Sequence, residues 1–218
     1  MKAATVLAGF CALPAILCLG AQETERTQGG RNLLINSDFS APLVRSVFQK
    51  PGWDSGIWIF GKENREKFTG EAAKLTRAAI VDTKEGKALE LKRPAAVETL
   101  MGAESPKFSL SSTQIVTLKD ENGGPYLLSF DARYESVGKN KAAHYLLVAF
   151  TDASDRRAGR GQETGKMLIR TLKPGKDWRN IRIRISVPAK TRDLRITFRG
   201  DGTGVFQLRN PELVKGAQ

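Results

Sequence analysis

Apolar and polar residues alternate with a period of two along several stretches in the second half of the chain. In residues 126–134 (YLLSFDARY), Leu128 and Phe130 fall on one side of an extended chain, and Asp131 and Arg133 fall on the other. This alternation predicts a strand that buries one face and exposes the other. Residues 179–187 (RNIRIRISV) and 194–199 (LRITFR) repeat the pattern and are predicted to be strands of the same kind.

Further strands are expected in segments that turn residues separate. Residues 144–150 (HYLLVAF) form a nearly continuous apolar run, which predicts a strand buried on both faces. Pro-Gly, Glu-Gly, Asn-Gly and Asp-Gly pairs mark turns between the expected strands, which are spaced about ten residues apart. This pattern predicts an all-β fold, a β-sandwich of the jelly-roll type. The other strand candidates are residues 32–36, 56–60, 74–81, 88–92 and 205–208.

One segment competes with this all-β interpretation. Residues 64–79 are rich in Glu, Lys and Ala, which favours a helix, but Thr69-Gly70 interrupts the segment. We expect a short helix or a turn there, and neither changes the fold class.

The N-terminus has the pattern of an export signal. Lys2 precedes an uncharged run of 17 residues, which is shorter than the about 20 residues that a membrane-spanning helix needs. Small residues at Cys18 and Gly20 favour cleavage after Gly20, and cleavage after Ala21 is the alternative. An uncleaved anchor helix and a lipid anchor are the competing interpretations. We expect a signal peptide over residues 1–21, a flexible leader over 22–31, a single domain over 32–213 and a short C-terminal tail over 214–218.

Composition excludes several kinds of site. The chain has one histidine, His144, so a metal site with two histidine ligands cannot form. Both cysteines, Cys11 and Cys18, lie in the predicted signal peptide, so we expect an exported domain without disulfides or a catalytic thiol. Removal of Lys2 with the signal lowers the formal net charge from +12 to +11. Despite this charge, export to the periplasm or the extracellular space disfavours nucleic acid as a partner, and we expect no stable membrane insertion after cleavage.

Several motifs, in a shared order, resemble the galactose-binding-domain-like jelly rolls, especially family 4 and family 9 carbohydrate-binding modules. Residues 32–39 (NLLINSDF) are similar to the opening strand of that family, and Pro51-Gly52-Trp53 is similar to its early Gly-Trp. The likeness continues through GKALEL at 86–91, YLLSFDAR at 126–133, Trp178 before a strand that ends Val187-Pro188, and FQLRNPEL at 206–213. The resemblance implies a jelly-roll fold with a concave sheet face, or a site among the loops, that can hold a saccharide.

The chain departs from the calcium site that many relatives carry. Ser40 follows Phe39 where the family has a carboxylate, and Arg209 stands where the closing Asp would be. A cation at that position repels Ca²⁺, although Asp38 and Asn210 can still offer oxygen ligands. We therefore expect no cofactor and no metal site, and structural calcium is disfavoured.

The candidate ligand-binding residues are large aromatic, acidic and basic side chains on expected strand faces. Trp58 faces outward if its neighbours Ile57 and Ile59 face the core, whereas Trp53, Trp178 and His144 fit structural roles better. Arg182 and Arg184 lie on the polar face of one strand, and Arg195 and Arg199 on that of the next. Because consecutive jelly-roll strands usually change sheets, we expect two separate basic stripes. The residues predicted to bind a ligand are Trp58, Asp131, Arg133, Tyr134, Arg182 and Arg184.

Three classes of function remain open from the sequence. Arginine forks suit carboxylate, sulfate or phosphate, so the preferred hypothesis is a non-catalytic carbohydrate-binding protein that favours an acidic glycan or another anionic envelope polymer. The arginines can equally serve to keep a β-surface soluble. A structural or protein-interaction domain with a protein partner is the second class. The third class is an enzyme, a polysaccharide lyase or a glycosidase. In a lyase, the catalytic residues would be His144, Tyr134, Arg133 and Gln114. However, Gln114-Ile115-Val116 lacks the histidine of the alginate-lyase-like motif.

Overall fold

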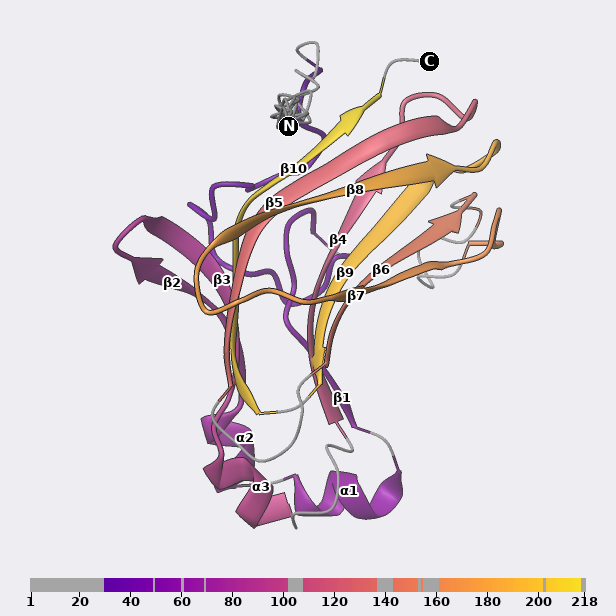
Figure 1. Ribbon diagram of the computed structural model, residues 1–218. Helices are drawn as coiled ribbons and strands as arrows, with labels where there is room; N and C mark the ends of the chain where they lie inside the picture. The colour runs from indigo at the N-terminus through magenta and orange to yellow at the C-terminus, as the bar shows by residue number, and fades with distance from the viewer. Residues whose placement is uncertain are drawn as a thin grey trace, which may run out of the picture.

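Two five-stranded antiparallel sheets pack face to face in the computed structural model (Figure 1). The structure describes residues 30–48, 50–59, 61–68, 70–101, 108–136, 143–152, 154, 161–201 and 203–216. The expected signal peptide, and the expected leader up to residue 29, lie outside these residues. The architecture agrees with the predicted all-β jelly-roll sandwich.

Each sheet is named here after its central strand. The β9 sheet has the order β1-β4-β9-β6-β7, with β1 (Gly56–Ile59), β4 (Phe108–Thr117), β9 (Asp193–Asp201), β6 (Ala143–Thr151) and β7 (Leu168–Leu172). The β10 sheet has the order β2-β3-β10-β5-β8, with β2 (Arg77–Thr83), β3 (Gly86–Arg93), β10 (Gly204–Lys215), β5 (Gly124–Ser136) and β8 (Arg179–Val187).

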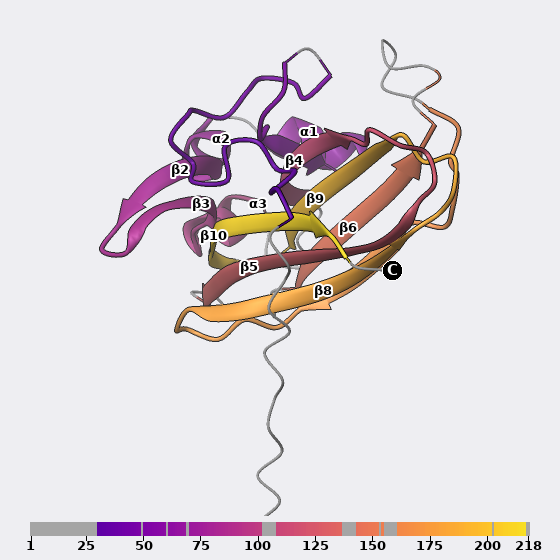
Figure 2. The ribbon, with the colours of Figure 1, turned by 90° about the horizontal axis from the view of Figure 1, so that it is seen from above.

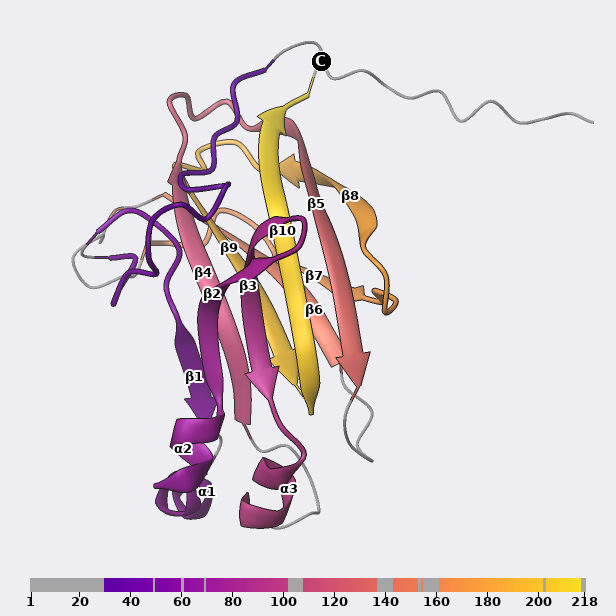
Figure 3. The ribbon, with the colours of Figure 1, turned by 90° about the vertical axis from the view of Figure 1, so that its left-hand side faces the viewer.

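The two outer faces of the sandwich differ in curvature. Figure 1 shows the strands of both sheets bending toward the side of the β9 sheet, so the outer face of the β9 sheet is concave and that of the β10 sheet is convex. Figure 3 looks onto the convex side, with β3, β10 and β5 in front of β4, β9 and β6. A ligand on the concave face therefore meets only side chains of the β9 sheet and of the segments beside it.

The core between the sheets consists of alternate residues of the central strands. Phe130 of β5 packs edge-on against Phe198 of β9, with 4.9 Å between the ring centroids. Trp53 is fully buried 5.7 Å from the ring of Phe198, which confirms its predicted place in the core. Burying such large rings is the main favourable term that holds the two sheets together.

The segment before β1 lies along the side of the sandwich next to β4 and β2, as Figures 2 and 3 show. The buried side-chain amide of Gln114 accepts a hydrogen bond from Ile35 N and donates one to Ile35 O, both at 2.8 Å. Asp54 N donates to Thr113 O at 2.9 Å. The Gln114 bonds satisfy both backbone polar groups of Ile35, and the Asp54 bond pairs the backbone edge of β4 beyond the short strand β1. Residues 32–36 are therefore held by a side chain and are not the strand that was predicted.

Other predictions about strands need smaller corrections. Residues 144–150 are not buried on both faces: in β6 every second residue is buried and the others are half-buried. The strand expected at 74–81 starts at Arg77 because α2 (Glu71–Leu75) precedes it. The last strand runs far beyond 205–208, to Lys215, with a bulge between Arg209 and Glu212. Strands β4 and β7 were not predicted.

Three short helices gather at one end of the sandwich (Figure 1). α1 (Lys62–Lys67) and α2 occupy the segment where a short helix or turn was expected, and α3 (Ala96–Met101) follows β3. Phe68, Ala72 and Val97 form a small apolar cluster between them, separate from the main core. Among the described residues, no helix has the length and apolar character needed to cross a membrane.

Candidate functional site

Trp58 lies on the concave face at the edge strand β1. It pairs with Ser109 of β4, its side chain is 59% exposed, and its Nε1 donates a hydrogen bond to Ser111 Oγ at 3.0 Å. Gly56 makes room for this arrangement, since an added Cβ would lie 2.6 Å from Ser111 Oγ and 3.7 Å from Trp58 Nε1. The hydrogen bond holds one edge of the indole against β4 while much of the ring surface stays open to solvent. Trp58 is exposed, as predicted, but Ile57, which was expected to face the core, is itself 44% exposed.

Two neighbouring rows of side chains cross the concave face beside the Trp58 indole. The strand register places Gly56, Ser111, Arg199, Tyr145 and Thr171 side by side on β1, β4, β9, β6 and β7. Adjacent strands are about 4.8 Å apart, so the row spans about 14 Å from β1 to β6. Trp58 pairs with Ser109, in the neighbouring row that continues to Asp201 and Ala143, and its indole reaches the first row through the hydrogen bond to Ser111.

An arginine–aspartate pair occupies the middle of the face. Arg199 Nε donates to Asp201 Oδ1 at 3.1 Å, and its Nη2 lies 3.4 Å from Asp201 Oδ2. Arg199 Nε also donates to Ser109 Oγ at 2.9 Å. The two side chains are 28% and 24% exposed, respectively. A guanidinium held in this way presents donors, and its carboxylate partner presents acceptors, in a fixed orientation.

A second polar cluster lies farther along β9. The Arg195 guanidinium stands 5.0 Å from the ring centroid of Phe48, and the hydroxyls of Thr113 and Thr197 are 3.1 Å apart. Asp54 Oδ1 accepts a hydrogen bond from Thr113 N at 2.8 Å. Burial raises the pKa of the Asp54 carboxyl, and the bonds from Thr113 and the charge of Arg195 only partly oppose this. The cluster extends the polar surface of the concave face beyond the row that contains Trp58.

The six residues predicted to bind a ligand do not form one site. Only Trp58 belongs to the β9 sheet. Asp131 and Arg133 of β5 point to the convex face, and so do Arg182 and Arg184 of β8, which pair in register with Ser129 and Leu127. Tyr134 lies between the sheets, where its hydroxyl donates to Thr203 O at 2.6 Å. The grouping was wrong because alternation along β5 places Tyr134 on the face opposite Arg133.

The two basic stripes lie on different sheets, as predicted. Arg182 and Arg184 are exposed on the convex face, on the edge strand β8. Arg195 and Arg199 lie on the concave face, on the central strand β9. The like charges therefore do not stand opposite one another.

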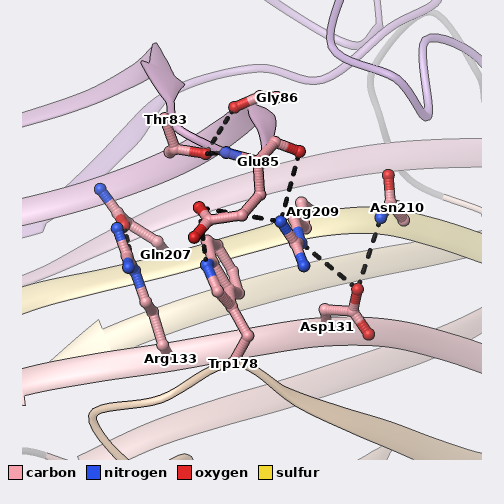
Figure 4. Close-up of polar contacts among 9 residues, drawn as sticks. All are labelled: Thr83, Glu85, Gly86, Asp131, Arg133, Trp178, Gln207, Arg209 and Asn210. Carbon is pink, nitrogen blue, oxygen red and sulfur yellow. Dashed lines mark hydrogen bonds and ion pairs between the residues drawn. The ribbon is translucent and has the colours of Figure 1, made fainter.

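Trp178 sits in a polar network on the convex face (Figure 4). Its ring lies between two guanidinium groups, 4.6 Å from that of Arg133 and 4.4 Å from that of Arg209. Its Nε1 donates to Glu85 Oε2 at 3.2 Å, and Arg209 Nε donates to Asp131 Oδ2 at 3.3 Å. Arg133 in turn donates to Gln207 at 2.7 Å. The protein's own side chains cover the indole, which supports the structural role that was expected for Trp178.

Replacing Trp178 by alanine is expected to lower the free energy of unfolding by about 1–2 kcal/mol, because two cation–π contacts of about 0.5–1 kcal/mol each are lost. Ligand binding on the concave face should not change. Urea unfolding measures the first effect and a binding titration the second. A variant that unfolds like the wild type but no longer binds its ligand would show that Trp178, and not Trp58, is the aromatic contact.

The residues considered for calcium are engaged in protein contacts. Arg209 pairs with Asp131, and Asn210 Nδ2 lies 3.4 Å from the same carboxylate. Asp38 Oδ1 accepts a hydrogen bond from Ser40 N at 3.1 Å. In the part of the chain that the structure describes, no three His, Cys, Asp or Glu side chains are grouped so that they could hold a metal ion. The expectation about calcium stays a prediction.

His144 lies on the inner face of β6 and not on either outer surface. It is 5% exposed, with its ring stacked 4.7 Å from that of Phe206 and 4.4 Å from that of Tyr134. Burial lowers the pKa of the imidazole from 6.5 to about 4, and the charge of Asp201 only partly opposes this shift. This environment agrees with a structural histidine.

A pocket of ≈ 410 Å³ opens in the segment from Ile35 to Gly52. Its lining is mostly apolar, with Asn36, Arg45, Ser46 and Lys50 among aliphatic and proline side chains. None of the lining residues is aromatic. The pocket therefore has no flat aromatic surface like the Trp58 indole, and the concave face is the stronger candidate for a ligand-binding site.

Sequence reasoning missed four residues of the concave face: Ser109, Ser111, Tyr145 and Asp201. Tyr145 could have been found from the alternation around it, because His144, Leu146 and Val148 all point inward. Ser109 and Ser111 belong to β4, whose inward side chains Ser112 and Gln114 are polar and hide the period of two. Asp201 had been assigned to a turn, and it is the last residue of β9.

Comparison with solved structures identifies the fold. No protein-family profile matches the chain, and no curated protein matches it in sequence. The chain is similar to the enzymatically active domain of tailspike protein 4 of bacteriophage CBA120, with a TM-score of 0.54, 14% identity and coverage of 84% of this chain but only 21% of the tailspike. It is also similar to a candidate sugar-binding protein from Bacteroides thetaiotaomicron, with a TM-score of 0.52, 15% identity and coverage of 85% and 100%.

A family 11 carbohydrate-binding module from Clostridium thermocellum, solved with a β-1,3-1,4-mixed-linked tetrasaccharide, is 16% identical over 87% of this chain and 98% of the module, with a TM-score of 0.48. At these identities the likeness concerns the fold alone. The chain has the jelly-roll β-sandwich fold that the resemblance in its sequence implied.

Proposed function

We propose that the protein is an exported, non-catalytic glycan-binding protein that holds its ligand on the concave face of the β9 sheet. One observation carries the proposal: the exposed indole of Trp58 lies on the same face as the Arg199–Asp201 pair and Tyr145, in the cross-strand row of Asp201 and next to the row of Arg199 and Tyr145. Export, to the periplasm or the extracellular space, rests on the signal-peptide pattern of residues 1–21.

The chemistry of the row suits a sugar chain. An aromatic ring packs against the apolar C–H face of a pyranose, and the polar groups beside it exchange hydrogen bonds with the hydroxyls. Small side chains lie around the pair (Gly56, Ser109, Ser111 and Ala143), and the side chains of the pair keep 28% and 24% of their surface exposed. A row of about 14 Å has room for a short oligosaccharide and not only for a single ring.

The positions of the acidic residues support binding without catalysis. Asp201 pairs in register with Ser109, whereas Asp54 is bonded to Thr113, four residues farther along β4. That offset is about 13 Å along the strand, more than the about 5–10 Å that separates the two carboxylates of a glycosidase. The residues considered for a lyase do not share an open surface: His144, Tyr134 and Gln114 point into the sandwich, and Arg133 lies on the convex face.

The proposal includes a preference for anionic glycans that arises from the charge of the whole molecule. The formal net charge is +12, and the exposed Arg182 and Arg184 lie on the convex face, away from Trp58. Charge at that distance attracts a polyanion through a field that salt screens.

We therefore expect any preference for an anionic polysaccharide over its neutral counterpart to disappear when ionic strength rises from about 10 mM to about 1 M, because the Debye length falls from about 30 Å to about 3 Å. Affinity electrophoresis in gels that contain either polymer measures the ratio at each salt concentration. A preference that persists at the highest salt would place the anion contact inside the binding site itself.

A glycan array or an affinity-gel screen with the purified protein tests the proposal, with Trp58→Ala as the second arm. Binding by the wild type that the variant loses supports the proposed site.

The second candidate function is a structural or protein-interaction domain of the cell envelope. The observation that favours it is the convex face, where the hydrogen-bonded side chains around Trp178 form a rigid surface (Figure 4). Absence of glycan binding across neutral, sulfated and uronic-acid ligands would favour that candidate.

A further inference from the structure

We infer that the side of the sandwich formed by the edge strands β7 and β8 is a second binding surface, which takes an extended polyanion, namely a sulfated or uronic-acid polysaccharide. This surface is separate from the concave face. The inference rests on the proposed function for the choice of a glycan as the polymer. It adds direct contacts at one place to the long-range attraction that the net charge provides.

Half of the formal net charge lies in one short stretch of the chain. Residues 166–184 (KMLIRTLKPGKDWRNIRIR) hold seven Lys and Arg and one acidic residue, Asp177, which gives +6 of the total of +12. Six of these cations, all exposed, lie on β7, on β8 and on the loop between them, and we call them the basic edge: Arg170, Lys173, Lys176, Arg179, Arg182 and Arg184. Such a concentration of one sign of charge attracts a polyanion to this side of the molecule.

The fold brings the basic edge to one side of the molecule. β7 and β8 end their respective sheets, only six residues connect them, and both lie at the front of Figure 1. Arg179 to Arg184 cover about 17 Å along β8, and stacked sheets lie about 10 Å apart. The basic edge is therefore long enough to meet several charged units of an extended chain and not only a single anion.

The loop between β7 and β8 is fixed to the body of the sandwich. Tyr134 N donates a hydrogen bond to Gly175 O at 2.8 Å. A Cβ added at Gly175 would lie 3.2 Å from Arg179 Cζ, so the guanidinium packs directly on the glycine. Trp178, the last residue of the loop, is stacked between two arginines. A surface that is held in place in this way loses little conformational entropy when it binds a ligand.

The chemistry of the basic edge suits sulfate and carboxylate groups. Arg182 and Arg184 point to the same side of β8, about 7 Å apart, and guanidinium groups bind such oxyanions with their N–H groups. Arg182 Nε donates to Asn180 Oδ1 at 3.2 Å, which orients the group. Ile181 and Ile183, which alternate with these residues, pack against the core and do not protrude as a bilayer-inserting side chain would. A polymer with oxyanions along its length therefore fits better than a lipid surface.

The basic edge adjoins the concave face at β7. Thr171 ends the cross-strand row of Arg199 and Tyr145, and Arg170 is its neighbour in the chain. A long acidic glycan that crosses the concave face can therefore continue onto the basic edge, and a polymer that is held at two places gains effective concentration at each. Trp58 lies at the opposite edge of the sheet, about 19 Å from β7, so the two surfaces can be altered separately.

The test removes two cations at a time from different places. Each variant lowers the net charge by two, so an effect of the overall field changes all of them equally. The exposed cations of the control lie on α1 and α2, at one end of the sandwich. The double variants are R182Q/R184Q and K173Q/K176Q on the basic edge, and R65Q/K74Q as the matched control.

Surface plasmon resonance on immobilised dextran sulfate, polygalacturonate and neutral dextran measures the affinities. At about 50 mM salt, each basic-edge variant should bind both polyanions at least about tenfold more weakly than the wild type, and the control should stay within about threefold. The slope of log K against log salt concentration should fall by about one for each contacting cation that is removed. Because K173Q/K176Q changes a loop and not a strand, it keeps the test valid if R182Q/R184Q does not fold.

Each alternative outcome has a distinct meaning. If the basic-edge variants bind like the control, or if the wild type binds neither polyanion, the inference is wrong, while glycan binding that Trp58→Ala abolishes preserves the proposed function. Binding to vesicles of phosphatidylglycerol and phosphatidylcholine that only the basic-edge variants lose, with polysaccharide binding unchanged, would make the edge a membrane surface and also overturn the inference. If Trp58→Ala keeps all glycan binding and the basic-edge variants lose it, the inference stands and the proposed site on the concave face falls.

Discussion

Replacing Trp58 by alanine should abolish measurable glycan binding while leaving the stability of the fold nearly unchanged. The indole is 59% exposed on the short edge strand β1, and its polar contact is a single hydrogen bond to Ser111. Aromatic residues at the centre of a binding surface commonly contribute 2 kcal/mol or more, so we expect a loss of at least about 30-fold in affinity. Because little of the ring is buried in the unliganded protein, its removal exposes little new apolar surface.

Two further variants serve as controls for Trp58→Ala. Trp58→Phe keeps a ring but loses the bond to Ser111, and it should keep part of the affinity. Trp178→Ala removes the same type of side chain from the convex face and should affect stability more than binding. Calorimetric titration gives the affinities and differential scanning calorimetry the melting temperatures. A large fall in melting temperature with Trp58→Ala would mean that the residue supports the fold, and the proposed binding role would then be wrong.

Acid should weaken the fold by up to about 3 kcal/mol through His144 alone. Its folded pKa is about 4, below the ordinary value of 6.5, because burial disfavours the charged imidazole. The unfolded chain therefore binds a proton that the folded chain refuses between these two values. The contribution to stability is fully present above pH 6.5 and is lost as the pH falls toward 4.

The variant His144→Phe isolates this effect. A phenyl ring can stack on Phe206 as the imidazole does but cannot take up a proton. Asp54, whose pKa is raised, acts in the opposite direction, but it is present in both proteins. Urea unfolding between pH 7 and 4 should show a shallower loss of stability in the variant. Parallel curves for the two proteins would show that His144 titrates normally in the folded state.

The strands that could be predicted from the sequence are those with one buried face and one polar face. β5 and β8 alternate cleanly because their inward residues are apolar over 126–134 and 181–187. β4 escaped prediction because two of its inward positions hold polar residues, Ser112 and Gln114. Gln114 is used by the backbone of Ile35, 79 residues away, and no local pattern indicates such a bond. The Gln114 side chain thus takes up the backbone groups of Ile35 that a strand would pair with a neighbouring strand.

The candidate site was only partly predictable for a related reason. Trp58 was placed outward on the assumption that Ile57 and Ile59 face the core, but Ile57 is exposed as well, so the assumption held only in part. The sequence does not say which strands share a sheet, and Trp58, Arg199 and Tyr145 come to the same face, in two neighbouring rows, only through the order β1-β4-β9-β6. Arg182 and Arg199 lie in similar alternating segments, yet one is on the convex face and the other on the concave face. Sheet membership, set by long-range packing, decides which arginine can meet a ligand on the concave face.

The three tryptophans provide the most direct test of the central claim that the concave face binds glycan. Trp53 is buried in the core, Trp178 lies between two guanidinium groups on the convex face, and Trp58 is exposed on the concave face. Each indole N–H gives its own signal in a ¹H–¹⁵N correlation spectrum, and single Trp→Phe variants assign the signals. Titration with a glycan that the protein binds should shift the Trp58 signal strongly and leave those of Trp53 and Trp178 nearly in place. A shift of the Trp178 signal while that of Trp58 stays unchanged would contradict the account and place the ligand on the convex face.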